Sequence, residues 1–230
     1  MKAAARYMIH SAPKRQWYVE NFLIPSMIEQ GISEDEIVVY CDRESKGNLQ
    51  ACMDAFRWCG NHQTAYGTWH LQDDILISRN FAEKTRLFHD GVVCGNVMKE
   101  WGPNYQKHGI QPVVELWYSF QCIHIPDSLA GECAKWFYEV ASKSNESKYR
   151  TRIISNKHDD DFFRFFLLDH YPHMRITNLK PNIVDHIDYM IGGSIANGER
   201  KKAVNRVAYW EDEDLIYELE EKLKQYCNNT

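Results

Sequence analysis

The chain lacks the features that mark membrane, secreted and repeat proteins. No uninterrupted apolar run approaches the roughly 20 residues of a membrane-spanning helix, and the first residues lack the long apolar region of a signal peptide. The sequence contains no internal repeat and no low-complexity segment. These absences predict a protein without a membrane span, which we expect in the cytoplasm.

Paired cysteines are also missing. The seven cysteines form no Cys-x-x-Cys pair, their number is odd, and their neighbours are mostly apolar. This pattern indicates reduced, buried thiols.

The composition is that of an ordinary globular protein. The 230 residues are 44% hydrophobic and 26% charged, enough for one sizeable core or two poorly separated lobes. The net charge of -5 argues against wholesale binding of polyanions, although it does not exclude local basic patches.

Strand and helix patterns alternate through the first hundred residues. Short β-favouring runs at 6–10, 36–42, 68–77 and 92–95 are separated by stretches with helical spacing of apolar residues. Pro25 is expected to kink the first helix, and Gly31 to end it. This alternation predicts an α/β fold with a mixed, mainly parallel sheet flanked by helices.

The second half of the chain is less regular. We expect strands at 112–118 and 121–125, a helix that Asp127 caps and that packs through a face ending at Val140, and a polar, basic loop over 142–157. Three acids, Asp159 to Asp161, precede an apolar helix. Extended stretches near 176–179 and 183–188 and a final helix over 211–226 complete the pattern.

Two adjacent acids, Asp73 and Asp74, follow the strand that begins at Thr68. Carboxylates at the end of a strand in an α/β sheet lie where ligands usually bind. Adjacent acids repel one another, so unless they are exposed they need a cation or hydrogen-bond donors nearby. Mg²⁺ or Mn²⁺ is a suitable partner. The alternative is a strand end that simply turns through Asp-Asp into a loop.

Taken together, several motifs resemble those of the GT-A class of nucleotide-sugar glycosyltransferases, especially its small single-domain phage and bacterial members. The motifs are His10-Ser11-Ala12-Pro13-Lys14-Arg15, Leu71-Gln72-Asp73-Asp74-Ile75, Asp159-Asp160-Asp161-Phe162, and Pro181-Asn182-Ile183-Val184-Asp185-His186-Ile187 with Gly192-Gly193-Ser194. They cover about residues 6 to 200, and their order and spacing are more specific than any one of them.

The resemblance implies one GT-A-like catalytic domain over residues 1–230. Residues 1–100 would form the nucleotide-sugar half, and residues 101–230 the acceptor half with the C-terminal helix. Binding of the nucleotide-sugar would fall to His10, Ser11, Pro13, Arg15, Asp42, Gln72, Asp73, Gly192, Ser194 and Arg200. Asp42 is equally well explained as a turn residue.

The metal motif departs from the usual Asp-x-Asp, because Gln72 stands in the first acidic position. The resemblance therefore makes Asp74 the main carboxylate ligand of Mn²⁺ or Mg²⁺. His186 would supply a second ligand from across the cleft, oriented by the neighbouring acids. With one carboxylate, the ion would be held loosely until the diphosphate of the donor arrives.

The chemistry implied is transfer of a sugar from a nucleoside diphosphate to an acceptor hydroxyl. The metal and basic groups such as Arg15 and Arg200 would stabilise the leaving diphosphate. Asp161, or else Asp160, would take the proton of the acceptor, giving inversion at the sugar carbon. In a retaining enzyme these acids would instead orient the acceptor. UDP is expected from its frequency in the class.

The acceptor is left open as a carbohydrate or a modified nucleic acid. Basic residues between 143 and 157 and between 200 and 206 favour a polyanion such as DNA bearing a hydroxylated base, in the host cytoplasm for a phage protein. Two alternatives remain. A nucleotidyltransferase should carry a glycine-rich phosphate loop, which the segment from His10 to Arg15 lacks, and a non-catalytic nucleotide-sugar binding protein would give the acids no joint purpose.

Overall fold

The chain forms a central mixed sheet, which confirms the predicted α/β class. A computed structural model describes residues 6–96, 109–112, 120–193 and 210–229. Within these residues the sheet has seven strands in the order β2-β1-β3-β7-β5-β8-β6. Their bounds are β1 Arg6–Ser11, β2 Ile37–Cys41, β3 Thr68–Gln72, β5 Val92–Cys94, β6 Gly109–Pro112, β7 Cys122–Ile125 and β8 Arg175–Asn178. Strands β6 and β7 run opposite to the other five, so the sheet is mainly parallel.

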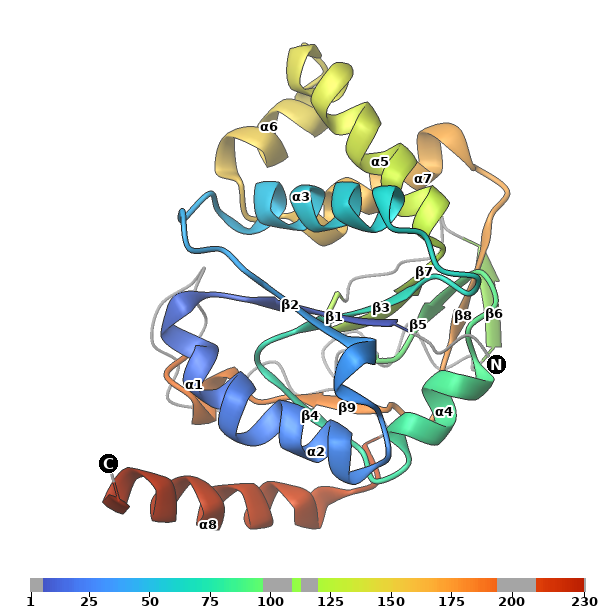
Figure 1. Ribbon diagram of the computed structural model, residues 1–230. Coiled ribbons are helices and arrows are strands. Elements are labelled where there is room, and N and C mark those ends of the chain that lie inside the picture. Colours follow the sequence, from blue (N-terminus) through green and yellow to red (C-terminus); the bar gives the residue numbers. More distant parts are fainter. Residues whose placement is uncertain (1–5, 97–108, 113–119, 194–209, 230) are drawn as a thin grey trace.

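Helices cover both faces of this sheet (Figure 1). One face carries α3 (Asn48–Asn61), α5 (Asp127–Glu139), α6 (Ser147–Ser155) and α7 (Asp159–His170). The other carries α1 (Gln16–Tyr18), α2 (Ile24–Glu29), α4 (Phe81–Leu87) and α8 (Glu213–Asn229). A small antiparallel ribbon of β4 (Ile75–Ile77) and β9 (Val184–His186) lies on this second side.

Two hydrophobic cores, one on each face, follow from the two-residue period of the strands. In β1, Tyr7 and Ile9 enter the core beneath the sheet, whereas Met8 enters the core under α3 and α5. Gly60 and Gly131 allow the backbones of α3 and α5 to approach closely: an added Cβ on Gly60 would lie 2.6 Å from the Cα of Gly131. The two cores hold the sheet between them and leave its strand ends free for a site.

The first helical segment contains a wider turn just before Pro25, where the sequence predicts a kink or an interruption. Residues Val19–Leu23 form a π-helical turn between α1 and α2, so the helix continues from 16 to 29 instead of breaking. Proline lacks the N–H of the regular ladder and its ring crowds the preceding turn, which the wider π turn relieves. Gly31, with φ of 81°, ends the segment as predicted.

Three local predictions in the second half are wrong. Instead of a loop, much of 142–157 forms α6. Tyr149 and the partly buried Ile153 give this helix one apolar side, which packs on the core under α3 and α5, called the upper core below. Asp127 does not cap α5. It is buried and pairs with Arg6 at 2.9 Å and with the hydroxyl of Thr68 at 2.6 Å. Val140 lies just past α5 and is exposed.

Other predictions are confirmed within the described residues. The acids from 159 to 161 start α7, and all seven cysteines are unpaired, with five of them buried. The predicted strand at 112–118 lies mainly outside the described residues, where only β6, ending at Pro112, can be placed. No helix of the described chain is long and apolar enough to cross a bilayer.

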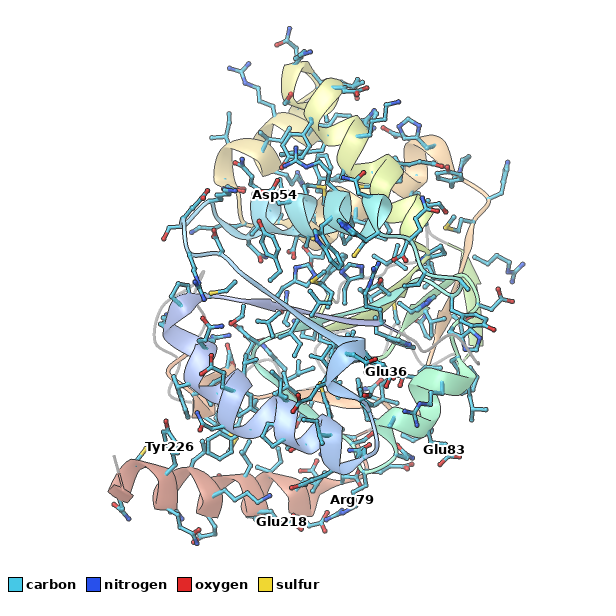
Figure 2. All side chains as sticks on the ribbon, in the orientation of Figure 1. Glu36, Asp54, Arg79, Glu83, Glu218 and Tyr226 are labelled. Atoms are coloured by element: carbon cyan, nitrogen blue, oxygen red, sulfur yellow. The ribbon has the colours of Figure 1, made fainter. Side chains whose placement is uncertain are left out.

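The last helix is fastened to the body of the protein at both ends. Arg79 pairs with Asp214 at 2.8 Å and Glu218 at 2.9 Å near the start of α8 (Figure 2). Toward the other end, the ring of Tyr226 stacks on Trp17, with 5.5 Å between centroids. Between these two ends, Leu219 and Leu223 of α8 are buried in the core beneath the sheet, the one that Tyr7 and Ile9 enter.

Candidate functional site

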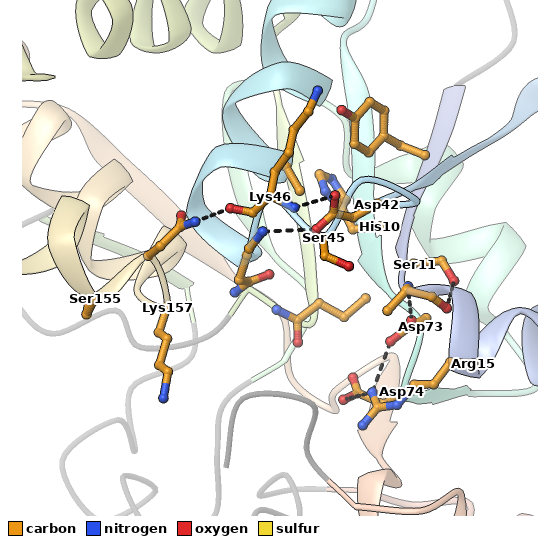
Figure 3. A pocket seen from close by; sticks show the side chains of 17 residues that line it. His10, Ser11, Arg15, Asp42, Ser45, Lys46, Asp73, Asp74, Ser155 and Lys157 are labelled. Atoms are coloured by element: carbon orange, nitrogen blue, oxygen red, sulfur yellow. Dashed lines mark hydrogen bonds and ion pairs between the residues drawn. The ribbon is translucent and has the colours of Figure 1, made fainter. Parts of the chain in front are cut away.

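A cavity of about 500 Å³ opens at the carboxyl ends of β1, β2 and β3 (Figure 3). This edge of the sheet is the usual binding position in α/β folds, and the volume suits a small-molecule ligand. The lining residues are His10, Ser11, Ala12, Arg15, Tyr40, Asp42, Ser45, Lys46, Gly47, Asn48, Ala51, Gln72, Asp73, Asp74, Ser155, Asn156 and Lys157. Most of the candidates from the first half of the sequence therefore meet in one place.

Buried charges form one end of the cavity. Arg15, only 2% exposed, donates from Nη1 to Asp73 Oδ1 at 2.9 Å and also to Asp74 Oδ2. The backbone amide of Ala12 donates to the other oxygen of Asp73 at 2.8 Å. The cation that adjacent acids require is therefore supplied by the protein itself, from the turn after β1.

His186 completes this charged end. Strands β4 and β9 pair so that His186 Nε2 lies 3.2 Å from Asp74 Oδ2. Burial alone would lower the pKa of His186, but the carboxylates of Asp74 and Asp188 outweigh it and raise the pKa. For Asp74, burial is likewise outweighed by His186 and Arg15, which hold its pKa well below the ordinary range. Two carboxylates thus face the guanidinium of Arg15 and an imidazole whose pKa is raised.

The other acid of the pair behaves differently. Burial, followed by the negative charge of Asp74, raises the pKa of Asp73 to about 6, although Arg15 and the Ala12 amide oppose the rise. Asp74 is therefore the carboxylate that stays ionised over the wider pH range, as expected for the main ligand of a cation.

The predicted metal ligands Asp74 and His186 do converge. The second oxygen of Asp74, Oδ1, is buried and forms no hydrogen bond within the described part of the chain. That oxygen and the His186 imidazole fit a divalent ion that takes its remaining ligands from phosphates and water. The described residues contain no group of three or more His, Cys, Asp or Glu side chains arranged around a metal. Within the described residues, the protein therefore offers two ligands for a metal ion and not a complete coordination shell.

Arg15 also joins this end to the late glycine segment. Its Nη2 donates to the carbonyl oxygen of Gly193. Gly192 is exposed and has φ of 97°, so a glycine is favoured there, but it does not line the cavity. Pro13 is exposed on the turn before Arg15 and does not line the cavity either. Ser194 and Arg200 lie outside the described residues.

A loop after β2 forms the opposite wall. Asp42 accepts hydrogen bonds from the backbone amides of Lys46 at 2.9 Å and Gly47 at 3.0 Å. Its carboxylate therefore folds the turn, as the alternative explanation of this residue proposed, and at the same time faces the cavity. Lys46 reaches Asp54 on α3 at 3.0 Å, which ties the loop to the upper helices.

Asn156 closes this wall from the other half of the chain. It lies between α6 and α7 with φ of 49°, donates to the Lys46 carbonyl and accepts from the Gln50 amide at 3.0 Å. Gly47 has φ of 90°, and an added Cβ there would lie 2.2 Å from the side-chain nitrogen of Asn156. Glycine is thus required for both its backbone angle and the close approach.

Three neighbouring strands place uncharged groups across the middle of the cavity. His10 of β1 is in register with Tyr40 of β2 and with Gln72 of β3, and all three line the cavity. Burial lowers the pKa of His10 to about 4, so its ring is neutral at physiological pH. The cavity therefore has a charged end and a neutral middle.

The proposed catalytic acids lie on the first turn of α7, and neither Asp160 nor Asp161 lines the cavity. Asp161 pairs with Arg152 of α6 at 3.2 Å. The acid that connects to the cavity is Asp159, which accepts a hydrogen bond at 2.7 Å from the side chain of Asn48, a lining residue. Their catalytic role stays a prediction.

Sequence reasoning missed three residues on the wall opposite the charged end, namely Lys46, Asn48 and Asn156, and it included Lys157 only among the basic residues of the expected loop. From the sequence alone, the run Lys46-Gly47-Asn48 after Asp42 is typical of a turn. Its position directly after a strand that ends in an acid, and directly before a helix, was a usable signal. Asn156 and Lys157 directly follow α6, so their place on the lining depends on a helix that was expected to be a loop.

A scan against models of protein families and a search of curated proteins found no match for this chain.

Proposed function

We propose that this chain is a metal-dependent glycosyltransferase of the GT-A class that moves a sugar from a nucleoside diphosphate, with UDP as the expected nucleotide, to an acceptor hydroxyl. One observation carries the proposal. His10, Ser11, Arg15, Asp42, Gln72, Asp73 and Asp74, which come from three separate stretches of sequence, surround a single cavity of nucleotide-sugar size.

The two parts of the cavity suit the two parts of such a donor. The neutral middle, with His10, Tyr40 and Gln72, suits the nucleoside, and the charged end suits the diphosphate. Arg15 is held in place by both acids and can stabilise negative charge that develops on the leaving phosphate. A divalent ion bound by Asp74 and His186 would neutralise further charge on that diphosphate.

The acceptor would approach from the wall formed by α6 and α7. Asn48 and Asp159 link that wall to the cavity, and Lys157 lies on its lining. Asp161, with Asp160 as the alternative, is kept as the proposed base for an inverting transfer. The acceptor is a carbohydrate or a hydroxylated base in nucleic acid, and a basic residue on the lining is compatible with either.

The first test is binding of UDP measured by calorimetry with and without Mn²⁺. We expect Asp74→Ala to weaken the Mn²⁺-dependent binding by at least tenfold, because loss of a charged contact costs about 1.5–3 kcal/mol. Asp35→Ala, an exposed acid on the short turn Glu34–Glu36, serves as the matched control and should bind like the wild type. Equal binding by wild type and Asp74→Ala would remove the metal site from the proposal.

The second test identifies the reaction. Incubation of UDP-sugars with saccharides and with DNA containing hydroxymethylated bases should yield a glycosylated product from one acceptor class, and the anomeric configuration of that product distinguishes inversion from retention. Release of pyrophosphate from a nucleoside triphosphate and a sugar phosphate would instead identify a nucleotidyltransferase. Donor binding without any turnover would identify a binding protein.

A further inference from the structure

Behind the neutral middle of the cavity lies a second histidine that has no role in the proposed chemistry. His70 of β3 is fully buried, and its Nδ1 lies 2.9 Å from Nε2 of His10. The ring of Phe56 packs against His70 edge-on, with 4.8 Å between centroids. His10 is half-buried and lines the cavity, whereas His70 does not. A ligand in the cavity can contact His10 directly. His70 can therefore influence that ligand only through its hydrogen bond with His10.

Both rings are neutral. Burial lowers the pKa of His10 to about 4. Burial, followed by the charge that a protonated His10 would carry, holds the pKa of His70 well below the ordinary value. A neutral imidazole has one N–H donor and one acceptor nitrogen. The hydrogen bond between the two rings therefore needs one ring to donate and the other to accept, which allows two arrangements.

The surroundings of His70 favour one of them. Its other nitrogen, Nε2, is buried and forms no hydrogen bond within the described residues. A buried N–H without an acceptor is rarer in native proteins than an acceptor without a donor. The proton of His70 therefore belongs on Nδ1, from which it donates to Nε2 of His10. Because His10 is neutral and accepts at Nε2, its own proton is on Nδ1.

We propose that His70 is a positioning residue that fixes His10 as the Nδ1–H tautomer, so that His10 presents a neutral donor to an acceptor oxygen of the bound nucleotide. The inference rests on the proposed function, since it names what one residue of that site recognises. His10 Nδ1 forms no hydrogen bond to the described residues and is the ring nitrogen left for a ligand. The oxygen belongs either to the nucleoside or to the phosphates.

The tautomer is measured directly on the wild-type protein by long-range ¹H–¹⁵N correlation of the histidine rings. We expect His10 to show a protonated Nδ1 and an unprotonated Nε2, with and without UDP. In His70→Phe the ring of His10 loses its partner, and the spectrum should show a mixture of tautomers. His70→Asn, whose amide nitrogen occupies a position like that of Nδ1, should restore the single tautomer. A wild-type His10 with its proton on Nε2 overturns the proposal.

Binding by calorimetry tests the contact itself. His10→Phe keeps a ring but removes the donor, and we expect UDP to bind about tenfold more weakly, the value of one net hydrogen bond. His173→Phe, an exposed histidine in the turn before β8, is the matched control and should bind UDP like the wild type. Uridine and pyrophosphate, measured separately, identify the source of the oxygen. A loss with uridine assigns it to the nucleoside, and a loss with pyrophosphate alone assigns it to the phosphates.

The remaining outcomes separate this inference from the proposed function. If UDP binds the wild type and His10→Phe equally well, the inference fails while the proposed function stands. If the wild type binds neither UDP, uridine nor pyrophosphate, both fail. Should His70→Phe not fold, as judged by circular dichroism, the wild-type ring spectrum and the His10→Phe titration still decide.

Discussion

The chain contains two runs of adjacent aspartates, and the protein treats them in opposite ways. Asp73 and Asp74 at the end of β3 are paired with a buried guanidinium and an imidazole. The acids from 159 to 161 at the start of α7 have a helix N-terminus, amide donors and one partly exposed arginine. Asp74 of the first run is therefore held in its ionised form by the cationic groups beside it. In the second run, burial followed by the charge of Asp160 raises the pKa of Asp159 to about 8. Two similar stretches of sequence therefore differ in charge. The aspartates after β3 belong to a centre of compensated charges, whereas those at the start of α7 are partly protonated.

The largest effect is expected from removing the internal cation. Arg15→Met leaves two buried carboxylates without their guanidinium, which should lower the free energy of unfolding by about 3–5 kcal/mol. Because a cation that binds only the folded state stabilises it, Mn²⁺ should restore much of the lost Tm. Chemical and thermal unfolding with and without Mn²⁺ measure both effects.

Lys14→Met is the matched control for this comparison. Lys14 is adjacent in sequence but exposed, so its replacement should leave the free energy of unfolding within about 0.5 kcal/mol of the wild type. Equal stabilities of the two variants would show that Arg15 does not compensate the acids.

A smaller effect of opposite sign is expected in the second run. The raised pKa of Asp159 means that the folded state disfavours its ionised form, so stability from this group is complete at about pH 4 and is lost as the pH rises through about 8. Asp159→Asn keeps the acceptor for Asn48 but removes the charge. We expect the free energy of unfolding of the variant to equal that of the wild type near pH 4 and to exceed it by about 1–3 kcal/mol above about pH 8.

Urea unfolding at several pH values across this window measures the difference. Asp169→Asn, at the far end of the same helix in a partly exposed pair with Lys148, should leave the pH dependence of the wild type unchanged. A wild type whose stability rises between these pH values relative to Asp159→Asn would contradict the assignment of Asp159 as a protonated residue.

The smallest effect on stability is expected at Asp161. Its pair with Arg152 is partly exposed, and such pairs contribute about 0.2–1 kcal/mol. If Asp161 is the base of the reaction, however, Asp161→Asn should lower kcat by about 10²–10⁴-fold. The free energy of unfolding should still fall by no more than the contribution of this ion pair. Asp160→Asn, measured beside it, decides between the two acids, since only replacement of the base should lower kcat to this extent.

Much of the fold was predictable because its signals are local. The alternation through the first hundred residues, the strand that ends at Gln72, Gly31 after the first helix and the acids before α7 all depend on spacing within a few residues. The same holds for the first half of the site. The residues near Asp42 and Asp73 follow strands directly, and strand ends of a parallel sheet meet at one edge.

What could not be predicted depends on contacts between distant segments. No local pattern shows that Arg15 would lie between Asp73 and Asp74, or that Asn48 would meet Asp159. The polar 142–157 segment concealed α6, because the few apolar side chains that hold it, such as Tyr149, acquire their meaning only against the upper core. Asp127 appeared to be a cap, whereas its partners, Arg6 and Thr68, are far away in sequence.

The guanidinium of Arg15, a residue near the beginning of this sequence, meets groups from its middle and late parts, because it contacts both acids after β3 and the carbonyl of Gly193. During synthesis, the carboxylates are made long before that carbonyl leaves the ribosome. The charged end of the cavity therefore stays incomplete in the ribosome-bound nascent chain until Gly193 has been added, and a protein truncated before Gly193 should never assemble it.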